Sequence, residues 1–99
     1  MKHIKDSNRK GDFAEYYAVT WLWDNGYEVF QNSGCTGLVD MIAMKDGMPT
    51  FIDVKTMTKD KGTDYRGKSS RTDEQKKLNV QFLLFHPETR ELRWSKHRT

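Results

Sequence analysis

Two β-rich runs interrupted only by charged residues constrain the fold of this chain more than any other feature. They are, in chain order, LVDMIAM and TFIDVKTM. The linker KDGMP between them contains Asp46-Gly47, the dipeptide favoured in a two-residue turn between antiparallel strands. The sequence therefore predicts a β-hairpin. Because both runs are apolar at nearly every position except Asp40, Asp53 and Lys55, we expect the hairpin to lie centrally in a sheet with both faces covered.

A two-residue turn would bring two acidic side chains together. With Asp46 and Gly47 as the turn, Asp40 lies directly opposite Asp53. Like charges facing each other across strands are destabilising, especially in an apolar sheet, so we expect a cation between them. Mg²⁺ meets that need, because it prefers oxygen ligands and is commonly held by one or two carboxylates with waters and phosphate oxygens. A longer loop would instead place Asp40 opposite Val54 and weaken the inference.

Lys55 follows Asp53 by two residues and therefore projects from the same face of the strand. Its ammonium group is suited to orienting an attacking water or to stabilising charge that develops on a phosphate. The alternative is a structural ion pair between Lys55 and one aspartate. An Asp-x-Lys triplet is common by chance in a chain of this length, so the inference depends on the neighbouring Asp40.

The remaining patterns predict a helix before the hairpin, and a helix and a second hairpin after it. Apolar residues recur at helical spacing from Asp12 to Asn25, and Gly26 ends the pattern. YEVFQ then predicts a strand, and NSGCTG a loop. Thr72 and Gln75 have the spacing of a capping box, which predicts a short helix. The segments VQFLLF and ELRWSK predict a closing hairpin around Pro87-Glu88-Thr89.

Length and composition suit one domain over residues 1–99 with a thin core, because 35% of the 99 residues are hydrophobic and 12% aromatic. We expect Trp21, Trp23 and Trp94 either to pack in that core or to cover apolar surface by pairing with another subunit. The single cysteine, Cys35, excludes an intramolecular disulfide framework. No apolar run approaches the roughly 20 residues that span a bilayer, and no signal segment is evident. We therefore expect a cytoplasmic protein, in the host cell cytosol if phage-encoded, with no membrane partner.

Charge is distributed unevenly along the chain. Residues 1–57 carry 6 Lys and Arg against 8 Asp and Glu, a net charge of −2, whereas residues 58–99 carry 11 against 6, a net charge of +5. An acidic part beside a basic part suits cation binding next to polyanion binding. The basic part opens with a glycine-punctuated segment that we predict to be a flexible phosphate-binding loop, the alternative being a solvated connector. Its cations are Lys59, Lys61, Arg66, Lys68 and Arg71.

The same segment also matches a nucleotide-binding pattern. Gly62–Ser69, GTDYRGKS, fits G-x-x-x-x-G-K-S, a loop that cradles nucleotide phosphates between a strand and a helix. Such a loop follows its strand directly, whereas Thr58–Lys61 intervene here, and no later apolar strand ends in an aspartate for Mg²⁺. P-loop-like nucleotide binding through Lys68 therefore remains a less favoured alternative.

The strings GDFAE, GLVD and FIDVKT, in this order, resemble the PD-(D/E)XK nuclease superfamily. The pattern is especially similar to archaeal Holliday junction resolvases and to small group I intron-associated homing endonucleases, and it covers residues 10–57 well and the rest loosely. The resemblance implies an α/β fold with a restriction-endonuclease-like core, αβββαβ, a central mixed sheet and a C-terminal β-hairpin. Val39 stands where the family's namesake proline is found.

The resemblance also implies roles for individual residues. Asp40 and Asp53 would be metal ligands and Lys55 the catalytic lysine. Glu15 would be the helix carboxylate that contacts the metal directly or through water, and the backbone carbonyl of Val54 would be a further ligand. Gln75 matches a glutamine that contributes to the site in several branches. Asn79, four positions later, departs from the tyrosine of one such branch.

The expected function is that of a Mg²⁺-dependent endonuclease, with Mn²⁺ as the other candidate metal, that hydrolyses phosphodiester bonds in duplex or branched DNA. We expect a homodimer, because two sites related by two-fold symmetry most simply cut both strands. A catalytically idle nucleic-acid-binding module on the same fold is an alternative, as is nucleotide binding through Gly62–Ser69.

Overall fold

The central hairpin forms as the sequence predicts. In the computed structural model, which describes residues 3–34, 37–59, 64–67 and 70–96, strand β2 (Met41–Lys45) pairs with β3 (Met48–Thr56) in antiparallel orientation. Lys45 lies opposite Met48, so Asp46 and Gly47 are the two turn residues. Both have positive φ, 53° and 76°, as a type I′ turn requires. The longer-loop alternative is therefore wrong.

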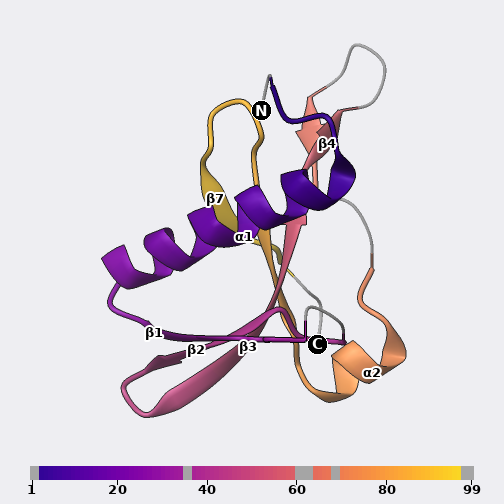
Figure 1. Cartoon of the computed structure of the whole chain (residues 1–99). Helices are drawn as coiled ribbons and strands as arrows, with labels where there is room; N and C mark the ends of the chain where they lie inside the picture. Colours follow the sequence, from indigo (N-terminus) through magenta and orange to yellow (C-terminus); the bar gives the residue numbers. More distant parts are fainter. Residues whose placement is uncertain (1–2, 35–36, 60–63, 68–69, 97–99) are drawn as a thin grey trace.

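Five strands form a mixed sheet, which confirms the predicted α/β fold class. Strands β1 (Glu28–Gln31), β6 (Gln81–Phe85) and β7 (Leu92–Trp94) complete the order β1-β2-β3-β6-β7. β3 and β6 run parallel, and every other neighbouring pair in this sheet is antiparallel. The pair β6 and β7 is the predicted C-terminal hairpin, and Figure 1 shows the central strands crossing beneath the long helix.

Helix α1 (Ser7–Asp24) begins five residues before the predicted start at Asp12. The side chain of Asp6 caps it by accepting a hydrogen bond from the backbone N–H of Asn8 at 2.9 Å. The first turn is polar, so the apolar periodicity could not reveal it. Across the described residues, neither helix combines the length and apolar character needed to cross a bilayer.

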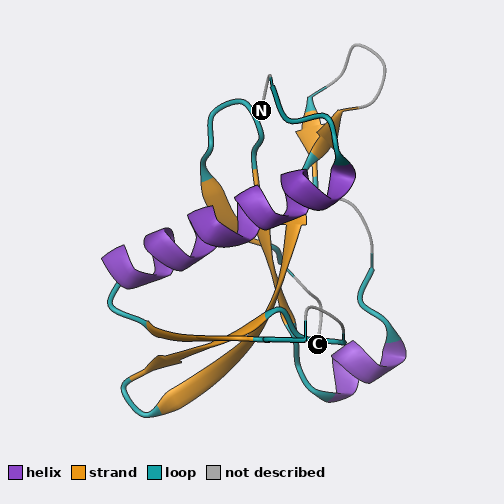
Figure 2. Cartoon of the chain, viewed as in Figure 1, coloured by secondary structure: helices purple, strands orange, loops and turns teal. Residues whose placement is uncertain are grey.

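α1 covers only one face of the sheet (Figure 2). The main core joins the helix to three strands through Ala18, Val19, Leu22, Met41, Ala43, Ile52 and Leu83. Trp21 and Trp94 pack against this core with ring centroids 6.0 Å apart, whereas Trp23 is 61% exposed. The expectation that the hairpin is covered on both faces is correct on the α1 side only, because Ile42 and Met44 on the other face of β2 are half-buried.

A second, smaller core lies on the opposite face. It consists of Met57, Phe82 and Leu84, with Tyr65 packed against them. Tyr65 belongs to a short ribbon formed by β4 (Thr58–Lys59) and β5 (Tyr65–Arg66). The predicted flexible loop is therefore partly strand, although Lys61 and Lys68 lie outside the described residues.

Helix α2 (Asp73–Lys77) is the predicted short helix, and its capping box is confirmed. The Thr72 hydroxyl accepts from the Gln75 N–H at 3.1 Å, and the Gln75 side-chain carbonyl accepts from the Thr72 N–H at 3.0 Å. These two hydrogen bonds fix the Gln75 side chain at the start of the helix, directly before β6.

Candidate active site

Asp40 lies immediately before β2, not within it as the sequence suggested. Its backbone N–H donates to the Ile52 carbonyl at 2.8 Å, although Met41 is the residue paired with Ile52. Asp40 and Met41 thus both face Ile52, as in a β-bulge, and the expected alignment of Asp40 directly opposite Asp53 is shifted. The Asp40 carboxylate in turn accepts from the Val54 N–H at 2.7 Å, which turns it toward β3.

The Asp40 and Asp53 carboxyl groups meet despite this shift. Burial raises the pKa of Asp40, and contact with the Asp53 carboxyl raises it further, to about 7. The Val54 N–H opposes the shift, and the charge of Glu15 adds to it. If both carboxylates were ionised at neutral pH, they would repel each other. A proton or a cation between the two groups is therefore favourable.

Two side chains contact the same oxygen atom of Asp53. The Gln75 side-chain N–H₂ donates to Asp53 Oδ2 at 2.9 Å, and Lys55 Nζ lies 3.3 Å from the same atom. The Asp53 side chain is only 12% exposed, whereas the Lys55 side chain is 40% exposed and lies over the Phe82 ring. Lys55 thus forms an ion pair and still reaches solvent.

Gln75 joins α2 to the carboxylate pair. Besides Asp53, its side-chain N–H₂ donates to the Leu38 carbonyl at 3.1 Å, while its oxygen belongs to the capping box. With all these partners, the side chain is buried. The amide is therefore rigidly placed, with its donor end toward Asp53.

Glu15 approaches the site from α1. Burial, then the charges of Asp12 and Asp53, raise the pKa of Glu15, so its carboxylate lies within the electrostatic reach of the pair. However, within the described ranges no three His, Cys, Asp or Glu side chains are grouped closely enough to hold a metal ion. The arrangement thus offers two adjoining carboxylates as ligands, which suffices for Mg²⁺, since Mg²⁺ keeps several waters.

A hollow of about 310 Å³ adjoins this site. It is lined by Asp12, Glu15, Tyr16, Gln31, Asn32 and Ser33. Sequence reasoning gave no role to Asp12, although it lies one helical turn before Glu15, a spacing that places both on one side of the helix. Tyr16 is 68% exposed beside them.

The predicted phosphate-binding cations are separated by the fold. Lys59 and Arg66 are exposed on the β4–β5 ribbon. Arg71 is only 9% exposed and donates to the Val80 carbonyl at 3.3 Å, so it does not join the exposed cations of the ribbon, and its role in phosphate binding stays a prediction. Lys61 and Lys68 lie outside the described residues, as does much of Gly62–Ser69.

Part of the chain is similar in sequence to curated proteins. No protein-family model matches the chain. Over 55 residues it is 36% identical to a "UPF0102 protein" of the spirochaete Treponema pallidum, with the same identity to the proteins of two strains. These alignments cover 54% of this chain and 44% of either relative, so the chain spans less than half the length of the curated relatives it matches.

A solved structure of a bacterial homing endonuclease is similar over almost the whole chain. The TM-score is 0.71 at 16% sequence identity, and the match covers 93% of this chain and 66% of the other. The chain therefore has a nuclease-like fold, in agreement with the core expected from the resemblance.

Proposed function

We propose that this protein is a metal-dependent endonuclease that hydrolyses phosphodiester bonds in DNA. The observation that carries the proposal is the adjoining pair Asp40 and Asp53 with Lys55 at 3.3 Å from Asp53. Two carboxylates and one ammonium group at the edge of a solvent-accessible site match what phosphodiester hydrolysis demands.

Asp40 and Asp53 would hold Mg²⁺ or Mn²⁺, with the Val54 carbonyl as a further ligand and Glu15 acting through a water. A divalent cation bound there would supply a Lewis acid for the phosphate. Gln75 keeps Asp53 in one orientation, because its amide bonds to the carboxylate and to the fixed Leu38 carbonyl.

Lys55 acts on the substrate itself. Its ammonium group, on a side chain that is 40% exposed, would donate hydrogen bonds to a non-bridging phosphate oxygen, where negative charge grows as water attacks phosphorus. The Asp53 carboxylate fixes that ammonium in position before the substrate arrives.

DNA is the proposed substrate, either a duplex or a branched junction. The structural similarity to a homing endonuclease supports the duplex, since that neighbour's name states its activity. We propose a homodimer for cleavage of both strands, because the described residues of one chain form one such site.

Two other functions, an idle nucleic-acid-binding module and nucleotide binding through Gly62–Ser69, require different features of the structure. An idle binding module would not need the Asp40–Asp53 repulsion, which costs stability. For nucleotide binding, the described residues 64–67 should form an open loop. Instead, Tyr65 and Arg66 pair with β4, and Tyr65 packs on the second core.

The test is cleavage of supercoiled plasmid, linear duplex and a four-way junction, with Mg²⁺ or with EDTA. We expect metal-dependent cutting that Asp53→Asn abolishes and that Lys55→Ala slows by roughly 100-fold or more. Asp24→Asn, a change of an exposed carboxylate at the end of α1, is the matched control and should cut normally. Binding without cutting by the native protein would favour the idle module.

A further inference from the structure

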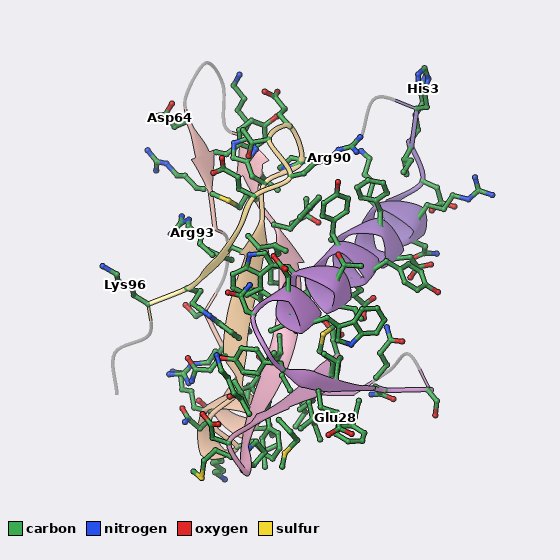
Figure 3. All side chains as sticks on the ribbon, turned by 90° about the vertical axis from the view of Figure 1, so that its left-hand side faces the viewer. His3, Glu28, Asp64, Arg90, Arg93 and Lys96 are labelled. Atoms are coloured by element: carbon green, nitrogen blue, oxygen red, sulfur yellow. The ribbon has the colours of Figure 1, made fainter. Side chains whose placement is uncertain are left out.

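Lys55 begins a row of side chains that crosses three strands. It lies opposite Leu84 on β6, and Leu84 lies opposite Arg93 on β7. Their neighbours Val54 and Leu83 pack in the core beneath α1. Because successive side chains of a strand point to opposite faces, the row lies on the face away from α1. Figure 3 shows Arg93 and Lys96 on that side of the sheet.

The β4–β5 ribbon brings a further cation to this row. Gly67 lies directly on Leu84, since a Cβ on Gly67 would overlap the Leu84 methyl group Cδ1. Tyr65 faces inward onto the second core, so its neighbour Arg66 faces outward and is exposed. Lys55 and Arg93 therefore lie on either side of Leu84 along the row, and Arg66 directly precedes the glycine that covers Leu84.

The two arginines of this group are available to an anion. Arg66 and Arg93 are exposed, and within the described part of the chain neither has a carboxylate at ion-pair distance, although Asp64 and Glu91 are close in sequence. The opposite half of the same face is apolar, with Phe30 51% exposed and Ile42 and Met44 half-buried. Among the described residues, the exposed Arg66 and Arg93 thus lie on the side of Lys55 that leads toward β7.

We infer that Arg93, together with Arg66, binds backbone phosphates a few nucleotides from the scissile one, so that the cleaved strand runs from β3 across β6 to β7. Adjacent strands lie about 4.8 Å apart, which places Arg93 about 10 Å from Lys55 along the row. That distance corresponds to roughly three nucleotides of rise along one DNA strand. This inference rests on the proposed function and adds the direction in which the substrate lies.

The experiment measures binding of a fluorescent duplex in Ca²⁺, which replaces Mg²⁺ to prevent cutting, over a range of salt concentrations. Arg93→Ala should weaken binding roughly five- to tenfold for unrelated sequences and reduce the slope of log K against log salt by about 1. Arg93→Lys keeps the charge and should retain most of the slope. Arg9→Ala removes an exposed charge from α1, on the other side of the sheet, and should leave both quantities unchanged.

Equal effects of Arg93→Ala and Arg9→Ala would overturn the inference while leaving the nuclease proposal intact, provided that the native protein binds and cuts DNA. A native protein that neither binds nor cuts would overturn both. Matching far-ultraviolet circular dichroism and thermal unfolding of the variants would show that a loss of binding is not a loss of fold.

Discussion

At the scale of single residues, Asp40 carries the clearest electrostatic signature. Its pKa rises from 3.8 in the unfolded chain to about 7 in the fold, first through burial and then through Asp53. Between these pH values the folded state holds more protons than the unfolded state, so the free energy of unfolding falls as pH rises. A bound cation would replace the proton and remove the free-energy cost of ionising Asp40 beside Asp53. Metal binding should therefore stabilise the fold at neutral pH.

The corresponding prediction concerns stability without metal. In EDTA, the free energy of unfolding should decrease by roughly 1–2 kcal/mol from pH 4.5 to pH 7.5, less than the full shift because water screens the half-exposed group. Asp40→Asn should remove this decrease. Urea unfolding of both proteins at the two pH values measures it, and equal pH dependence in the two would contradict the assignment.

Gln75 gives a second prediction at this scale. Gln75→Glu keeps an oxygen for the Thr72 N–H but replaces the donor to Asp53 with a carboxylate. We expect the cleavage rate to fall roughly 10- to 100-fold, as for other groups that orient a metal ligand. Thr72→Ala is the control, because it removes the capping hydroxyl at a cost of about 1 kcal/mol without touching Asp53. A Gln75→Glu protein that cuts normally would assign Gln75 to the helix cap alone.

At the scale of elements, replacing a glycine by alanine should have opposite effects on the free energy of unfolding in the hairpin turn and in α1. Gly47 has φ of 76° in the hairpin turn, so Gly47→Ala should lower the free energy of unfolding by about 1 kcal/mol. Gly11 lies inside α1 with open space around it, so Gly11→Ala should raise stability by roughly 0.5–1 kcal/mol. Urea unfolding of both variants checks the pair, and a stabilised Gly47→Ala would contradict the turn geometry.

The elements also show which structure can be predicted from sequence. The Asp46-Gly47 turn and the Thr72 capping box were predictable, because local residue types determine both. The early start of α1 at Ser7 was not predictable from apolar spacing, because the capping residue Asp6 and the first turn are polar. The burial of Arg71 depends on the Val80 carbonyl of a later segment, which no local pattern reveals.

In the candidate site too, features set by local residue types were predictable, whereas features set by contacts between distant segments were not. The two-residue turn predicted which carboxylates meet, because it sets the register that brings Asp40 near Asp53. The bulge at Asp40 and the position of Arg93 could not be predicted, since both depend on contacts between strands that are distant in sequence.

At the scale of the whole molecule, the proposed function requires a small chain, with one such site among its described residues, to cut two strands. If two copies assemble on one duplex, the two cuts are coupled through assembly, so the product should depend on protein concentration. At low concentration, supercoiled plasmid should accumulate as nicked circles. At higher concentration it should become linear, and light scattering should show a dimeric mass over the same range.

A mixture provides the decisive version of this experiment. Native protein mixed with an excess of Asp53→Asn should form mixed dimers with one active site each, which nick DNA but rarely linearise it. The mixture should therefore raise the ratio of nicked to linear product at constant native concentration. A ratio that is unaffected by the inactive variant would show that each chain cuts alone, and the dimer proposal would then be wrong even if the cleavage chemistry holds.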